Sequence, residues 1–374
     1  MTPKPRRIVE RLIRTAVPQS GRYCALRLDK NERCAGYPAS VVRGMLRTVS
    51  SDQLTAYPEP GPLYERLAKL HRVEIDNLAV TAGSELAIRY LFEAFLGPGD
   101  ELVLLNPSFA MFEVYARLRG ARLVPVNFDR SWQVEPDEIL RCITARTKMV
   151  ALANPNNPTG TVLDEKALLA IARRASRFGA LLLVDEAYYH FYKQTMLDHF
   201  PRFENLVITR TFSKAFGAAG VRLGYAIGSQ RVIAMLNKVQ PIDHVNAFAV
   251  LIGCYLLDHE ALMEDYVRQT IAGKRYLVAA LSKLGIPAIN TQANFVLADV
   301  GCNKSTIIGL LRDRNVHVGA VLRLPFPSNH IRVTAGPPLV MRRFISALKE
   351  SLIALERGIN GKAVSAFHLA QRFA

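Results

Sequence analysis

The stretch LLLVDEAY at residues 181–188 is the strongest indication of the fold in this sequence. An unbroken apolar run that ends in an acidic pair is typical of a β-strand buried on both faces. Residues 148–153 and 206–210 are also mostly apolar and are followed by polar residues, and residues 165–178 have the apolar spacing of an amphipathic helix. Buried strands that alternate with helices predict an α/β domain with a mostly parallel sheet flanked by helices.

The pattern changes toward the C-terminus. Residues 249–284 read as one long helical stretch, which is followed by short strands and a last helix near 340–357. This order predicts a second, smaller α+β domain. We therefore expect an N-terminal arm at residues 1–39 that joins the small domain, a large domain at 40–250 and a small C-terminal domain at 251–374.

Composition and charge argue against several classes of protein. Basic residues exceed acidic ones by 48 − 32 = 16, but they are scattered, without the basic runs or aromatic–basic alternation of nucleic-acid-binding proteins. The longest apolar stretch, residues 247–257, is too short to span a membrane. The five cysteines contain no C-x-x-C pair and the eight histidines form no metal-ligand pattern, so we expect no bound metal. This cysteine usage fits a reducing cytoplasm.

Polar residues follow three of the predicted strands. They are the segment NPNNPTG at 154–160, the segment DEAY at 185–188, and the segment TRTFSK at 209–214 with Arg222 beyond it. Ligands of parallel α/β sheets collect at the carboxyl ends of the strands, so we expect these residues to meet in one crevice. Taken singly, the segments could be rigid turns or helix caps. Their combination, in this order, indicates a functional site.

These segments resemble the fold type I aminotransferases, which use pyridoxal phosphate (PLP), and within that group they are similar to the histidinol-phosphate aminotransferases. The resemblance implies an aspartate-aminotransferase-like fold with a large PLP-binding domain. It covers most of the chain and is carried by residues 28–32 (LDKNE), 57–60 (YPEP), 82–85 (AGSE), 154–160, 185–188, 211–216 (TFSKAF), 220–224 (GVRLG) and 331–334 (IRVT).

The resemblance assigns the residues around the cofactor ring. Lys214 is implied as the amine that bonds covalently to PLP and then moves a proton, which is work that a positioned acid/base performs. Asp185 is implied as the partner of the ring nitrogen, where a carboxylate stabilises the protonated form. Asn157 and Tyr188 are implied as hydrogen-bond partners of the ring oxygen. Phe109 is in the position of a stacking aromatic residue, although tyrosine is more usual there in the family.

The cofactor phosphate needs an anion-binding site, and a helix N-terminus with nearby hydroxyl and guanidinium groups supplies one. The resemblance assigns this role to Gly83, Ser84, Glu85, Thr211, Ser213 and Arg222. It also implies a homodimer, because Tyr57 is in the position of a family residue that reaches the cofactor phosphate of the partner subunit.

The expected substrate site includes residues of the smaller domain. The resemblance implies that Arg332 and Arg323 hold a substrate phosphate, and we expect Asn157 at the same site. Tyr23 either lines this pocket or packs within the N-terminal arm. The sequence around Arg323, VLRLPF at residues 321–326, differs from the sequence that is usual at this position in the family. Two arginines at these positions fit L-histidinol phosphate, with glutamate and 2-oxoglutarate as the amino donor pair in a ping-pong reaction.

Three alternatives remain open from the sequence. One is an aminotransferase for an aromatic, phosphonate or natural-product substrate. Another is a PLP-dependent decarboxylase that resembles the threonine-phosphate decarboxylases, which need arginines for a phosphate as well. The third is a PLP-dependent DNA-binding regulator, but residues 1–39 are too few for the additional winged-helix domain that such proteins carry.

Overall fold

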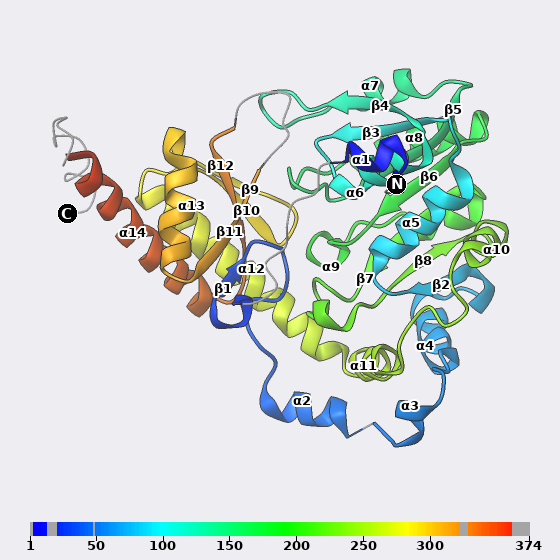
Figure 1. The fold of residues 1–374 in the computed structure, drawn as a ribbon, viewed down its shortest axis with the longest axis horizontal. Helices are drawn as coiled ribbons and strands as arrows, with labels where there is room; N and C mark the ends of the chain where they lie inside the picture. Colours follow the sequence, from blue (N-terminus) through cyan, green and yellow to red (C-terminus); the bar gives the residue numbers. More distant parts are fainter. Residues whose placement is uncertain (1–2, 13–20, 48, 322–327, 361–374) are drawn as a thin grey trace. The chain divides into compact units, whose positions relative to one another are not determined.

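A computed structural model describes residues 3–12, 21–47, 49–321 and 328–360, which form two compact units (Figure 1). The larger unit contains the described residues up to 12 and residues 37–260. The smaller unit contains the described residues among 17–36 and those from 261 onward. The sequence-based division places limits after residues 39 and 250, whereas the units of the structure meet at residues 36/37 and 260/261. The residues before 13 lie in the larger unit.

The larger unit is built on a seven-stranded sheet with the strand order β2-β8-β7-β6-β5-β3-β4. The neighbouring strands from β7 to β4 pair in parallel, and β8 pairs antiparallel with both β7 and β2. The expected fold class is therefore confirmed, with one antiparallel strand inside a mostly parallel sheet. The strands are β2 (Leu78–Thr81), β3 (Glu101–Asn106), β4 (Arg122–Asn127), β5 (Thr147–Ala153), β6 (Leu181–Asp185), β7 (Leu206–Thr211) and β8 (Gly224–Gly228).

Helices cover both faces of this sheet because its central strands are apolar on both sides (Figure 1). Leu181 and Leu183 of β6 belong to one core with α5, α6 and α10, and Leu182 and Val184 belong to another with α7 and α8. The helices of the larger unit are α1 (Arg7–Glu10), α2 (Ala39–Leu46), α3 (Asp52–Thr55), α4 (Gly61–His71), α5 (Ser84–Phe95), α6 (Ala110–Arg119), α7 (Pro136–Cys142), α8 (Glu165–Arg177), α9 (Tyr189–Tyr192), α10 (Gln230–Val239) and α11 (Ala247–Asp258).

Side-chain caps determine where several of these helices begin. The Asp164 carboxylate accepts a 2.8 Å hydrogen bond from the backbone N–H of Ala167 at the start of α8. Ser229 and Asn246 accept from the first turns of α10 and α11 in the same way. Each cap satisfies a backbone donor that has no partner within the helix, which stabilises the helix by about 1 kcal/mol.

The smaller unit has a five-stranded sheet with the order β1-β11-β12-β10-β9. Strand β1 pairs in parallel with β11, and the other strands pair antiparallel, so this unit is of the expected α+β type. Its elements are β1 (Leu26–Leu28), α12 (Glu260–Lys283), β9 (Ala288–Asn290), β10 (Phe295–Asp299), α13 (Lys304–Asp313), β11 (Val316–Ala320), β12 (His330–Thr334) and α14 (Pro338–Asn360). Helix α12 begins at the limit between the two units.

The long helical stretch expected at residues 249–284 is interrupted in the structure. Helix α11 ends at Asp258 and α12 begins at Glu260, because His259 leaves the helical region with φ −127° and ψ 47°. Within the described parts of the chain, no helix combines the length and the apolar character needed to cross a membrane.

Candidate active site

Asp185 lies at the carboxyl end of β6 and is 6% exposed. Its partner in register on β7 is Thr209, whose hydroxyl donates a 2.8 Å hydrogen bond to Oδ1 of Asp185. Burial raises the pKa of Asp185 to about 6, while the hydrogen bond from Thr209 and the positive charge of Lys214 act in the opposite direction. The carboxylate is thus buried within reach of the Lys214 charge, and a further cationic partner would stabilise its ionised form.

Lys214 follows β7 and lies near a second predicted residue. Its Nζ atom is 5.8 Å from the centroid of the Tyr188 ring, and Tyr188 itself is only 3% exposed. Tyr188 is three residues after Asp185 and directly precedes α9. Since the Lys214 charge also acts on Asp185, the structure brings Lys214, Asp185 and Tyr188 together. These three are the residues that the sequence predicts to be catalytic.

Asn157 occurs in the loop after β5, among other asparagines with different roles. The side chain of Asn154 exchanges hydrogen bonds of 3.2 and 2.9 Å with the backbone of Leu163. The side chain of Asn156 donates to the carbonyl of Pro107 at 3.0 Å and accepts from the Ser108 hydroxyl at 2.7 Å. Both are buried and hold the loop in shape, whereas Asn157 is half-buried.

The predicted anion-binding residues surround the start of α5. Gly83 has φ 89°, and a Cβ atom there would lie 2.6 Å from Nη2 of Arg222, so the guanidinium group packs directly against the backbone of this turn. Nη1 of Arg222 donates to the Ser213 hydroxyl at 3.4 Å, and the backbone N–H of Ser213 donates to the Thr211 hydroxyl at 3.1 Å. A helix N-terminus, a guanidinium group and two hydroxyls form the kind of cradle that binds a phosphate.

Gly224 allows this cradle to form. It pairs with Thr81 and Thr211 on the two neighbouring strands. A Cβ atom at this position would lie 2.2 Å from the backbone nitrogen of Ser84, far inside van der Waals contact. The absence of a side chain therefore lets β8 approach the first turn of α5 and its unpaired N–H groups.

The structure also shows the surroundings of three other predicted cofactor residues, Glu85, Phe109 and Tyr57. The carboxylate of Glu85 accepts a 2.9 Å hydrogen bond from Tyr115, so a contact of Glu85 with a phosphate would use its backbone N–H. Phe109 precedes α6, is half-buried and makes an edge contact with Phe112 at 5.6 Å between ring centroids. Tyr57 is 81% exposed between α3 and α4.

Two of the predicted substrate residues, Arg332 and Tyr23, are described in the smaller unit, whereas Asn157 belongs to the larger one. Arg332 lies on β12, where its Nη2 atom donates to the carbonyl of Asp29 at 2.7 Å and its guanidinium carbon is 5.6 Å from the Phe295 ring. Tyr23 is 95% exposed in the short turn before β1. Arg323 lies outside the described residues.

The comparisons with known proteins agree with this geometry. The sequence pattern of the family "Aminotransferase class I and II" matches residues 25–348. The chain belongs to the class I and II aminotransferases. The expectation of a PLP-dependent aminotransferase, made from the motifs, is thereby confirmed at the level of the family.

Individual relatives of this aminotransferase extend over nearly the whole chain. Histidinol-phosphate aminotransferase of Symbiobacterium thermophilum is 35% identical over 89% of this chain and 92% of its own length. The enzyme of the same name from Thermoanaerobacter sp. is 31% identical over 87% of this chain and 93% of its own. A crystal structure of histidinol-phosphate aminotransferase from Sinorhizobium meliloti in complex with pyridoxal-5'-phosphate shares the fold, with a TM-score of 0.82 at 22% identity over 93% of this chain and 97% of that one.

The residues of this aminotransferase are suited to PLP. The cofactor carries a phosphate, for which the cradle at α5 offers N–H, hydroxyl and guanidinium donors. It also carries a ring nitrogen that functions in the protonated form, and the buried Asp185 carboxylate is a suitable counter-charge. Lys214, the amine that the sequence predicts for covalent attachment, lies within electrostatic reach of that carboxylate.

Several neighbours of these residues were not predicted from the sequence. No role was predicted for Thr209, because its contact with Asp185 depends on the register of β6 against β7. Glu186 and Arg210 form a buried ion pair at the same strand ends. A signal was present in the sequence, since a charged residue directly follows both Asp185 and Thr209, but only the pairing of the strands shows that they meet.

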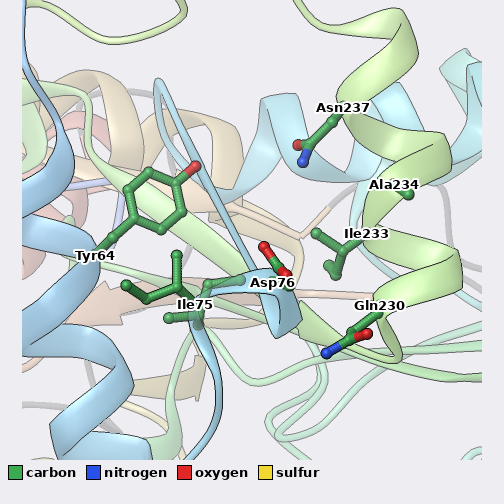
Figure 2. Close-up of a pocket in the computed structure, with 8 residues that line it drawn as sticks. Tyr64, Ile75, Asp76, Gln230, Ile233, Ala234 and Asn237 are labelled. Carbon is green, nitrogen blue, oxygen red and sulfur yellow. The ribbon is translucent and has the colours of Figure 1, made fainter.

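A separate pocket lies between α4, α10 and the short turn before β2 (Figure 2). It has a volume of about 340 Å³, with Tyr64 on one side and Ile233 and Asn237 of α10 on the other. None of the predicted site residues lines it. This pocket is therefore distinct from the predicted site around Asp185.

Proposed function

We propose that this aminotransferase passes an amino group between L-histidinol phosphate and the glutamate/2-oxoglutarate pair. The observation that carries the proposal is the similarity to curated histidinol-phosphate aminotransferases over 87–89% of the chain. The type and place of Arg332 support it, because a guanidinium group on β12 of the smaller unit has the planar donor geometry that binds a phosphate.

PLP, when bound, supplies a ring that accepts the electron pair left at the substrate carbon. In the proposed site, the Asp185 carboxylate would stabilise the protonated ring nitrogen, while Thr209 keeps that carboxylate oriented. The amine of Lys214 would hold the cofactor covalently and, once the substrate amine has displaced it, would move the proton of the substrate carbon. Tyr188 and Asn157 would be the hydrogen-bond partners of the ring oxygen.

The substrate preference can be tested directly with the purified enzyme. We expect kcat/KM for L-histidinol phosphate to exceed that for L-histidinol by about 100-fold, since two or more charge-assisted hydrogen bonds to the phosphate are lost in L-histidinol. Release of carbon dioxide from a phosphorylated amino acid, without amino transfer, would instead establish the decarboxylase alternative.

Replacing Arg332 by lysine tests the phosphate contact. An ammonium group cannot reproduce a bidentate fork, so Arg332→Lys should lower kcat/KM for L-histidinol phosphate by about 10- to 100-fold and change that for L-histidinol much less. Arg343→Lys on the exposed face of α14 is the matched control and should leave both values unchanged. An equal loss for both substrates would show that Arg332 does not hold the phosphate.

The enzyme is proposed to work as a homodimer in which Tyr57 reaches the cofactor phosphate of the partner subunit. The support is a group of exposed apolar residues on α2, α3 and the loop that follows: Leu46, Leu54 and Tyr57 are 54%, 64% and 81% exposed. Clustered exposed apolar side chains mark interaction surfaces. The mass in solution should be twice that of the chain, and a monomer that retains full activity would refute this assignment.

We also place the enzyme in the cytoplasm. All five cysteines lie among the described residues and are free thiols. Unpaired cysteines are typical of reducing compartments.

A further inference from the structure

A buried ion pair joins the ends of the two strands that carry Asp185 and Thr209. The Arg210 guanidinium donates to Oε2 of Glu186 from Nε at 3.0 Å and from Nη2 at 2.8 Å. The side chains of Arg210 and Glu186 are only 5% and 1% exposed. Thr195 and the backbone N–H of Met196 donate further hydrogen bonds to the same carboxylate, so its charge is fully solvated by protein donors.

The pair lies on the opposite side of the strands from the proposed cofactor site. Side chains alternate along a strand, and Val207 of β7 packs in the core with α5 while Ile208 packs in the core with α8. Thr209 therefore shares the α5 face, and Arg210 shares the other face. Their partners at the end of β6 follow the same order, because Thr209 contacts Asp185, the last residue of β6, and Arg210 contacts Glu186, which follows it.

Arg210 also fixes the chain beyond Glu186. Its guanidinium carbon lies 3.8 Å from the centroid of the Tyr189 ring, so Arg210 holds the segment 185–189 at Glu186 and again next to Tyr188. On the other side it contacts Tyr225, its partner in register on β8, and the Tyr225 hydroxyl is 2.8 Å from Nε2 of His71. The network thus spans three strands and the last turn of α4.

The charges in this network are balanced locally. Burial and the charge of Arg210 lower the pKa values of His71 and His190 to about 3, so both imidazoles are neutral near pH 7. Glu186 raises the pKa of Asp185, and the neighbouring Arg210 offsets the charge of Glu186. Removing Arg210 alone would therefore leave a buried anion next to Asp185.

A buried ion pair of this kind is weak support for stability as such, since an apolar replacement is often equally stable. We propose that the Glu186–Arg210 pair is a positioning device for the cofactor ring. It fixes the segment from Asp185 to Tyr189 and the adjoining end of β7, so that the carboxylate and the phenol meet the ring in one orientation. This inference rests on the proposed site for PLP.

The test removes both charges at once, because a single substitution would leave an unpaired buried charge and could prevent folding. We would compare the double variant Glu186→Gln/Arg210→Met with the single variant Tyr225→Phe, which keeps the pair and removes one hydroxyl. The control is Glu101→Gln/Arg146→Met, a buried carboxylate and its arginine at the amino end of β3 in the same sheet.

Three quantities would be measured on the full chain: the dissociation constant for PLP, the pH midpoint of the absorbance change of bound PLP, and the melting temperature. Supporting partners of a site typically change ligand affinity by about 10- to 100-fold, so the double variant should bind PLP at least about 10-fold more weakly and shift the pH midpoint. Tyr225→Phe should weaken PLP binding by about 3-fold and shift the pH midpoint in the same direction as the double variant. The control should keep the wild-type affinity and midpoint even where its melting temperature falls.

The outcomes separate this inference from the site assignment. If the wild-type chain does not bind PLP, the proposed site itself is wrong. If the wild type binds and the folded double variant has the same affinity and pH midpoint, the pair has a structural role only and the inference is overturned. Should the double variant not fold, Tyr225→Phe decides, and unchanged affinity and midpoint in that variant would overturn the inference as well.

Discussion

Lys214→Ala is expected to abolish amino transfer and the absorbance band that covalently bound PLP gives near neutral pH. The amine is the proposed point of covalent attachment, and it also moves a proton at the substrate carbon. Loss of the proton transfer alone costs about 10²- to 10⁴-fold in rate, and loss of the covalent link is additional. The structure supports the assignment because the Lys214 charge acts on Asp185 and its Nζ lies near Tyr188.

The experiment needs a control for the removal of a lysine as such. Lys166 is exposed on α8, and Lys166→Ala should retain both the band and the activity. PLP should remain associated with the Lys214 variant without a covalent bond, because the phosphate cradle around Arg222 is intact. A Lys214→Ala enzyme that keeps the band would mean that another amine is the attachment point, and the assignment would be wrong.

The sequence predicted those parts of the fold that depend on local patterns. The runs at 148–153, 181–185 and 206–210 become β5, β6 and β7, because unbroken apolar residues must be covered on both faces. The polar segments that follow these strands are brought together, since parallel strands place their carboxyl ends at one edge.

What the sequence did not predict depends on contacts between distant residues. The antiparallel direction of β8 is decided by pairing with β7 and β2, and nothing local to residues 224–228 specifies it. The break at His259 has no proline or glycine to mark it. The helical spacing of apolar residues therefore continues through a position where the backbone leaves the helix. The Glu186–Arg210 pair joins residues 24 positions apart, and strand register alone brings them into contact.

Asp185→Asn should retain PLP but slow turnover by at least about 100-fold, the loss expected when a positioned electrostatic partner is removed. The amide has nearly the same shape as the carboxylate and can still accept a hydrogen bond from Thr209, so the local structure should persist. It cannot stabilise a proton on the ring nitrogen by charge. A variant with nearly normal kcat would rule out this role for Asp185.

The same substitution has a pH signature in the cofactor-free protein. Burial raises the pKa of Asp185 from 3.8 to about 6, so the folded state binds this proton more tightly than the unfolded state does. The carboxyl group therefore destabilises the fold as pH rises from about 4 to about 6, by about 3 kcal/mol in all at about 1.4 kcal/mol for each unit of pKa shift. Asp185→Asn should remove this loss, and the stability difference from wild type should vanish below about pH 4.

Asp258 provides a control of opposite sign for this pH dependence. Its hydrogen bonds with Arg66 lower the pKa of Asp258, so its contribution to stability is present above the pKa of the unfolded chain and is lost as pH falls. Asp258→Asn should therefore make the cofactor-free protein less stable at neutral pH, where Asp185→Asn makes it more stable. Denaturant unfolding of both variants from about pH 2 to about pH 8 covers both slopes, since the Asp258 slope lies below the unfolded pKa of 3.8 and the Asp185 slope lies above it. If the Asp185 variant loses stability with rising pH as the wild type does, the carboxyl group with the raised pKa is not that of Asp185.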